Sequence, residues 1–141
     1  MNILYTHYIS VEEYNVLRDS VGWSRIPDHQ TAKGLKNTLF SICARSEGRA
    51  VGFARVLGDS GYTAVIADVM VMPQYQGNGI GKNMINEIMN YIKGSMSPGD
   101  RVLVYLMANK NRESFYKQFG FVERPCEEYG AGMTQWLSAE G

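Results

Sequence analysis

The sequence has no excess of charge of either sign, because 14 Lys plus Arg balance 14 Asp plus Glu over its 141 residues. A protein that coats nucleic acid needs a basic face, so a nucleic-acid partner is not expected. No apolar run approaches the roughly 20 residues of a membrane-spanning helix, and the first residues lack the basic and apolar regions of a signal peptide. These absences predict a cytoplasmic protein with no membrane partner.

Cysteine is scarce, whereas glycine is abundant. Cys43 and Cys126 lie far apart and in no CxxC or Cys/His spacing, so neither a disulfide framework nor a metal site is expected. The length is that of one domain, residues 1–141, with its own core. The 15 glycines exceed the usual share of roughly 7%, so their placement is informative.

Hydrophobic spacing and turn residues predict the order β-α-α-β-β-β-α-β-α-β-β, which is an α/β fold with a mixed sheet. Ser10 and Glu13 form a capping box that starts a helix over 11–20. Short turns join three central strands into an antiparallel meander. The expected strands are 2–8, 39–45, 50–57, 62–72, 101–107, 121–123 and 133–137, and the further helices start near 28, 80 and 111.

A glycine-rich turn follows the third strand of the meander. Gly77, Gly79 and Gly81 lie between a Val-rich strand and a long amphipathic helix. Glycines let the backbone approach a ligand, and the free N–H groups and dipole of a helix start attract phosphate or pyrophosphate. The spacing is neither GxxxxGK[ST], since Asn83 follows Lys82, nor GxGxxG. The glycines alone fit a plain strand-to-helix turn equally well.

Two motifs make the sequence resemble a known family. The run Q-G-N-G-I-G at 76–81 resembles the Q/R-x-x-G-x-G/A signature of the Gcn5-related N-acetyltransferases (GNAT), and 109–121 resembles their N-x(6)-Y-x(3)-G-F motif. The resemblance implies one GNAT-like domain whose mostly antiparallel mixed sheet is splayed between strands four and five, with helices on both faces. Segments 21–27, 64–69 and 132–136 are similar to the plant chloroplast branch, which includes serotonin acetyltransferases and enzymes that act on protein lysines.

The resemblance also implies the position of acetyl-CoA. The backbones of Met70 and Val71 would pair with the pantetheine amides, and a backbone N–H near Val71 would stabilise the oxyanion. Asn109 matches a position that contacts the cofactor, although it could instead cap a helix. The residues that would hold the pyrophosphate are Gln76, Gly77, Asn78, Gly79, Ile80, Gly81 and Lys82.

Two residues are candidates for proton transfer. Tyr116 matches the tyrosine that in many family members protonates the departing thiolate; the alternative is a core aromatic. Asp68 is the one acidic residue in the strand before the turn, and it serves either as a base or as a structural hydrogen-bond acceptor. Many relatives carry a carboxylate where this chain has Ala67, and strand alternation predicts that positions 67 and 68 face opposite ways.

The resemblance implies transfer of acetyl from acetyl-CoA to the primary amine of a small molecule, by direct attack through a tetrahedral intermediate. Trp23, Tyr129 and Trp136 either line an acceptor pocket that tolerates aromatic groups or simply pack. Two alternatives stay open: acetylation of protein lysines or N-termini, and a catalytically silent CoA-binding module. A homodimer through the last strands is expected from resemblance alone.

Overall fold

A computed structural model describes residues 1–139 of the chain. These residues form two compact units, Met1–Leu106 and the segment from Met107 onward. The first unit contains the sheet and three of the helices, and the second contains one short helix.

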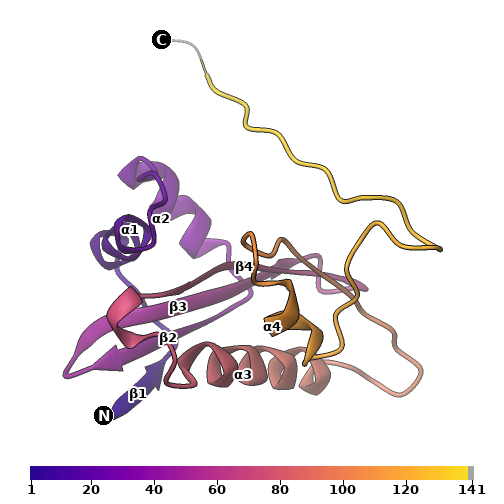
Figure 1. Ribbon diagram of the computed structural model, residues 1–141, viewed down its shortest axis with the longest axis horizontal. Helices are drawn as coiled ribbons and strands as arrows, with labels where there is room; N and C mark the ends of the chain where they lie inside the picture. The colour runs from indigo at the N-terminus through magenta and orange to yellow at the C-terminus, as the bar shows by residue number, and fades with distance from the viewer. Residues whose placement is uncertain (140–141) are drawn as a thin grey trace. The chain divides into compact units, whose positions relative to one another are not determined.

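The first unit is built on a five-stranded sheet in the order β1-β2-β3-β4-β5 (Figure 1). Strands β1 to β4 are antiparallel to their neighbours, whereas β5 runs parallel to β4. The predicted α/β fold with a mixed, mostly antiparallel sheet is therefore confirmed. The elements are β1 (Ile3–Thr6), α1 (Val11–Ser20), α2 (Asp28–Lys36), β2 (Phe40–Ser46), β3 (Arg49–Gly58), β4 (Thr63–Val71), the 3-10 turn η1 (Pro73–Tyr75), α3 (Ile80–Gly94) and β5 (Leu103–Leu106).

Helices cover both faces of the sheet, as predicted. Tyr14 of α1 meets the Phe53 ring edge-on at 5.9 Å, whereas a Cβ built on the adjacent Gly52 would meet Ile80 of α3 at 3.3 Å. Because neighbouring residues of a strand point to opposite faces, α1 and α3 lie on opposite sides (Figure 1). The amphipathic helix expected after the glycine turn is α3. Of the six apolar residues at helical spacing, Met89 is half-buried, and the other five are buried: Ile80, Met84, Ile85, Ile88 and Ile92.

Local sequence signals explain where α1 starts. The Ser10 side chain accepts from the Glu13 backbone N–H at 3.1 Å, and the Glu13 carboxylate accepts from the Ser10 N–H at 3.0 Å. This reciprocal pair satisfies two of the donors that a helix N-terminus leaves free. The capping box predicted from sequence is thus present.

A β-bulge interrupts β4. Arg55 pairs with Ala67 and Phe53 pairs with Met70, so two residues of β4 lie opposite Ala54 alone. The bulge residue Asp68 has a left-handed backbone, with φ of 56°. A bulge bends its strand and increases the local twist, and the pairing of β4 with β5 ends at Ile66, directly before it.

The second unit contains α4 (Glu113–Lys117) and no strand among its described residues. The strands expected at 121–123 and 133–137 are therefore wrong. A strand is stable only when it pairs and buries one face, and Met133, Trp136 and Leu137 are at least 84% exposed. Their apolar spacing is typical of a strand, but no described strand pairs with this segment.

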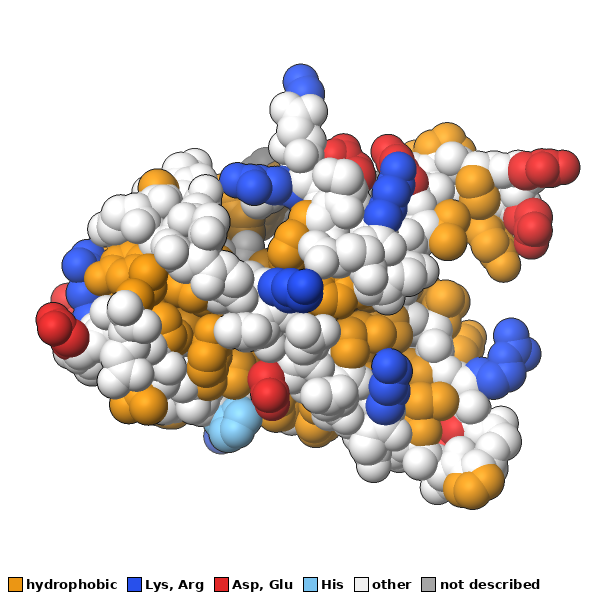
Figure 2. Space-filling model, turned by 60° about the horizontal axis from the view of Figure 1, so that its bottom comes forward, with side chains coloured by type: hydrophobic (Ala, Val, Ile, Leu, Met, Phe, Trp, Pro, Cys, Tyr) orange, Lys and Arg blue, Asp and Glu red, His pale blue; other side chains and the backbone are white. Residues whose placement is uncertain are grey.

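No helix in the described part of the chain is long and apolar enough to cross a membrane. Within the same residues, no three His, Cys, Asp or Glu side chains gather in a group suited to a metal ion. On the face drawn in Figure 2, Lys and Arg side chains are scattered, some of them next to Asp or Glu side chains.

Candidate active site

The bulged part of β4 offers unpaired backbone to a ligand. In the part of the chain that the structure describes, β5 pairs with Thr63–Ile66 and no strand pairs with β4 beyond Ile66 on that side. Met70 is 1% exposed, whereas Val71, the last residue of β4, is only half-buried. An extended molecule with amide groups could therefore pair with this edge as an added strand.

The turn after β4 leads this edge into the start of α3. Gly77 and Gly79 have φ of 81° and 80°, and a Cβ at either position would meet nothing within 4 Å. Glycine is favoured here by the left-handed backbone and not by lack of space. Gly79 is the N-cap of α3, and its carbonyl accepts the first helical bond from Asn83 at 3.0 Å.

The first residues of α3 supply the donors that a phosphate needs. The backbone N–H groups of Ile80, Gly81 and Lys82 precede the first helical hydrogen bond, so the helix itself gives them no acceptor. The α3 helix has 15 residues, and its dipole adds partial positive charge at the same end. The Lys82 side chain, on the first turn, is exposed.

Two amide side chains hold the turn in shape. Gln76 donates to the Val71 carbonyl at 2.9 Å, and Asn78 donates to the Tyr75 and Gln76 carbonyls at 3.0 and 3.2 Å. These contacts tie the turn to the end of β4. Both residues thus order the backbone on which the predicted phosphate contacts depend.

Asp68 lies at the centre of a partly buried polar group that we call the Asp68 cluster, consisting of Asp68, Tyr14, Arg18 and Arg55. Asp68 Oδ2 accepts from the Tyr14 hydroxyl at 2.8 Å and from Arg55 Nε at 2.6 Å. Arg18 Nη1 lies 3.8 Å from Oδ1. Burial, followed by the nearby Asp68 charge, raises the pKa of the Tyr14 hydroxyl above its usual value.

The expectation that positions 67 and 68 face opposite ways is wrong. Ala67 is the cross-strand partner of Arg55 and therefore shares its face, and the Asp68 carboxylate is bonded to Arg55 on that same face. The bulge breaks the two-residue alternation of the strand. Three members of the cluster, Tyr14, Arg18 and Arg55, were missed at the sequence level, because nothing in the local pattern relates them to position 68.

Trp23 reaches the same cluster through Arg18. The Arg18 guanidinium lies 5.3 Å from the centre of the Trp23 ring and donates from Nε to the Ser24 carbonyl at 2.6 Å. Asn15, which is buried, exchanges two hydrogen bonds with the backbone of Ile26. The loop that carries Trp23 is therefore held against α1.

The remaining predicted residues belong to the second unit. Tyr116 is buried and packs edge-on against Phe115 and Phe121, and burial raises the pKa of its hydroxyl above the usual value. The Asn109 carbonyl accepts from the Arg112 N–H at 2.9 Å in the turn before α4. The Arg124 guanidinium lies 4.8 Å from the Tyr129 ring, and Trp136 is exposed.

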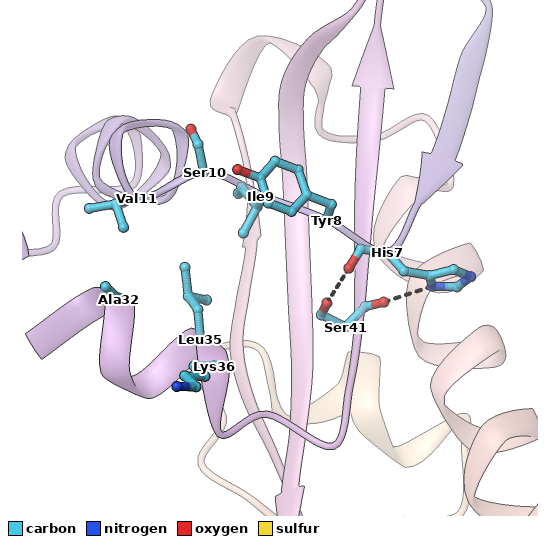
Figure 3. A pocket seen from close by; sticks show the side chains of 9 residues that line it. All are labelled: His7, Tyr8, Ile9, Ser10, Val11, Ala32, Leu35, Lys36 and Ser41. Carbon is cyan, nitrogen blue, oxygen red and sulfur yellow. Dashed lines mark hydrogen bonds between the residues drawn. The ribbon is translucent and has the colours of Figure 1, made fainter.

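A groove of about 340 Å³ lies elsewhere in the first unit (Figure 3). His7 and Ser41, two of its lining residues, are joined by two hydrogen bonds, from Ser41 Oγ to the His7 carbonyl at 2.8 Å and between His7 Nδ1 and the Ser41 carbonyl at 2.9 Å. None of the predicted site residues lines it. The lining residues are His7, Tyr8, Ile9, Ser10, Val11, Ala32, Leu35, Lys36 and Ser41.

In this protein a bulged strand with one unpaired edge leads through a glycine turn into the start of a helix. This arrangement defines a class, an α/β protein that can bind an extended ligand carrying a phosphate group at one end. The family model described as acetyltransferase (GNAT) domain matches residues 37–123, more than half of the chain. The chain belongs to the GNAT acetyltransferase family.

Three comparisons place the chain within that family. A Glycine max protein named a histone acetyltransferase is 34% identical, with 83% of this chain and 54% of that protein covered. A chloroplastic protein of Oryza sativa subsp. japonica named serotonin N-acetyltransferase 2 is 28% identical, with 83% and 58% covered. The chain therefore spans little more than half the length of these relatives, and the predicted likeness to the plant chloroplast branch is confirmed.

The third comparison is a crystal structure of a probable acetyltransferase of unknown function from meticillin-resistant Staphylococcus aureus. It superimposes with a TM-score of 0.85 at 30% identity, and the match covers 96% of this chain and 100% of that chain. The fold described above is therefore that of the family.

Proposed function

We propose that this protein transfers acetyl from acetyl-CoA to the primary amine of a small molecule by direct attack through a tetrahedral intermediate. The observation that carries the proposal is the continuity of the unpaired β4 edge with the Gly77–Gly79 turn and the start of α3. Because the chain belongs to the GNAT family, the ligand that we expect at this edge and turn is acetyl-CoA.

Acetyl-CoA fits the groups that the first unit presents. It would supply an activated acetyl thioester, with an amide-containing arm and a pyrophosphate. The Met70 and Val71 backbones would pair with the arm, and the N–H groups from Gly77 to Lys82 would bind the pyrophosphate. Gln76, whose own N–H donates to the Pro73 carbonyl at 3.2 Å, would order the turn that presents them. A backbone N–H near Val71 would stabilise the negative charge that develops on the carbonyl oxygen.

Proton transfer is assigned to the second unit. Tyr116 would protonate the departing thiolate, and Asn109 would contact the cofactor. Burial raises the pKa of the Tyr116 hydroxyl, so the phenol carries its proton in neutral solution, as a general acid must before it reacts. The attacking ammonium must also lose a proton to a carboxylate or a water. Asp68 Oδ2 already accepts two hydrogen bonds, which supports a structural role for Asp68 over that of the base.

The acceptor is proposed to be an amine with an aromatic group, bound with help from Trp23, Tyr129 and Trp136. The relative named serotonin N-acetyltransferase supports this choice. A protein lysine is the second candidate, because another relative is named a histone acetyltransferase. A homodimer through the C-terminal segment remains a prediction from family resemblance.

A thiol-release assay tests the proposal. The protein is incubated with acetyl-CoA and a panel of arylalkylamines, aliphatic amines, polyamines and lysine peptides, and CoA binding is measured in parallel by calorimetry. Amine-dependent release of thiol with the arylalkylamines supports the proposal, whereas release only with peptides moves the acceptor to protein lysines. CoA binding without turnover on any acceptor would identify a silent binding module.

A further inference from the structure

We propose that Asp68 is a positioning residue that holds the β4 bulge and so aligns the unpaired edge, residues 69–71, for the coenzyme. The inference rests on the proposed function, because it assigns a purpose to the edge at which acetyl-CoA would bind. Its observations are separate ones: the backbone of Asp68, the partners of its carboxylate and the register of β4.

The backbone conformation of Asp68 is unusual. Its φ of 56° is uncommon for any residue with a Cβ, although Asp is among those that tolerate it best. Glycine would adopt the same φ without strain. The presence of Asp therefore points to its carboxylate, which does something that a glycine could not.

The carboxylate ties the bulge to two other elements of the first unit. Tyr14 reaches Oδ2 from α1 and Arg55 reaches it from β3. Arg55 is itself held, since its Nη1 donates to the Gly34 carbonyl at 3.1 Å and to Thr38 Oγ1 at 3.2 Å. Arg55 is thus held by contacts other than Asp68, and together with Tyr14 it favours one position of the Asp68 carboxylate.

The bulge in turn determines which part of β4 is free. Directly before it, Ile66 pairs with Leu106 of β5; directly after it, Met70 and Val71 pair with β3 alone. A change in the bulge therefore shifts the direction of the edge relative to the glycine turn. An extended ligand that binds both the β4 edge and the glycine turn would then be misaligned. We expect its affinity to fall more than the rate of the chemical step at the thioester.

The charges of the cluster make the choice of substitution important. Two arginines, Arg18 and Arg55, face one carboxylate, and Arg18 is only 7% exposed. Asp68→Asn keeps an oxygen acceptor for Tyr14 and Arg55 and also tolerates positive φ. Asp68→Gly keeps the backbone freedom and removes every side-chain contact. Both variants tolerate the positive φ, so a difference between them reports the loss of the side-chain hydrogen bonds.

The test compares KM for acetyl-CoA, kcat, calorimetric Kd for CoA and Tm in the wild type, Asp68→Gly and Asp68→Asn. We expect about a tenfold increase in KM and Kd for Asp68→Gly with a smaller change in kcat, and less than about threefold for Asp68→Asn. Tyr14→Phe deletes one hydroxyl and should raise KM about threefold, which keeps the test usable if Asp68→Gly fails to fold.

Asp59→Gly is the matched control. The Asp59 carboxylate also orders backbone next to β4, accepting from the N–H groups of Gly61 and Thr63 at 2.8 and 3.2 Å, but at the opposite end of the strand. The Asp59→Gly substitution should lower Tm and leave KM for acetyl-CoA unchanged.

Three results would overturn the inference. A lower Tm with unchanged KM and Kd in the Asp68 and Tyr14 variants would make the cluster merely structural. Loss of kcat in Asp68→Asn, with a changed pH profile and an unchanged KM, would make Asp68 the base instead. Failure of the wild type to bind CoA would refute the proposed function, and this inference with it.

Discussion

Arg45 holds Glu13 with two parallel hydrogen bonds, from Nη1 to Oε2 at 2.7 Å and from Nη2 to Oε1 at 3.1 Å. The pair joins β2 to the first turn of α1. Because Glu13 also closes the capping box with Ser10, one carboxylate both ends the loop after β1 and fixes α1 to the sheet.

Glu13→Gln should therefore destabilise the protein. The paired guanidinium and the backbone N–H of Ser10 hold the pKa of the Glu13 carboxyl at about 2, well below 4.5. Since the side chain is partly exposed to solvent, we expect a loss of about 1–2 kcal/mol at pH 7. Urea unfolding measures it. Glu12→Gln, in the same helical turn and exposed, is the control and should cost less.

The same pair predicts a pH dependence. A carboxyl whose pKa is lower in the folded than in the unfolded state stabilises fully above the unfolded value, and its contribution is lost as pH falls through the folded value. The difference between wild type and Glu13→Gln should thus be constant near pH 7 and shrink between about 4.5 and 2. A difference that stays constant down to pH 3 would contradict the assignment.

Gly79→Ala should weaken CoA binding. A Cβ at this N-cap meets no neighbour, but the φ of 80° is strained for alanine, at a cost of roughly 1–2 kcal/mol. The start of α3 should shift to relieve it, raising the Kd for CoA about tenfold. Gly94→Ala, at the other end of α3 where a Cβ also has open space, should leave Kd unchanged and keep or raise Tm. Equal Kd values in both variants would exclude a role for the turn.

Tyr116→Phe should reduce kcat by about a hundredfold, in the range of a general acid, with CoA affinity within about twofold of wild type. Because burial raises the pKa of the hydroxyl above 10, the wild type should keep its donor protonated across pH 7–9.5. Single-turnover and calorimetric measurements separate the two effects. Tyr62→Phe, at an exposed position before β4, is the control. Unchanged turnover at neutral and alkaline pH would make Tyr116 a core aromatic.

Asn15→Ala should loosen the loop that carries Trp23. The side chain is 1% exposed and satisfies both the N–H and the carbonyl of Ile26. Removing it takes the side-chain partner from the half-buried Ile26 N–H, at about 1–3 kcal/mol, whereas the Ile26 carbonyl keeps a bond from Thr31 Oγ1 at 3.3 Å. Limited proteolysis should then cut within 21–27, whereas Asn90→Ala on the exposed side of α3 should change neither stability nor cleavage. A wild-type cleavage pattern in Asn15→Ala would show that other contacts hold the loop.

Much of this protein follows from its sequence alone. The capping box at Ser10 and Glu13, the short turn between β2 and β3 and the amphipathic helix after the glycine turn are signals carried by neighbouring residues, and all three elements form as predicted. The two motifs also place the chain in its family without reference to the structure, because each is contained within one short segment.

The tertiary structure alone determined the surroundings of Asp68. Strand alternation predicts that the Asp68 side chain lies on the face of the sheet opposite to that of Ala67. The bulge instead places it on the same face as Arg55. Its partners are 13 and 54 residues away in the chain, so no local pattern could relate them. The strand expected at 133–137 was wrong for the same physical reason. A strand and a partly buried ion pair both depend on a partner distant in sequence, and only folding determines whether that partner is present.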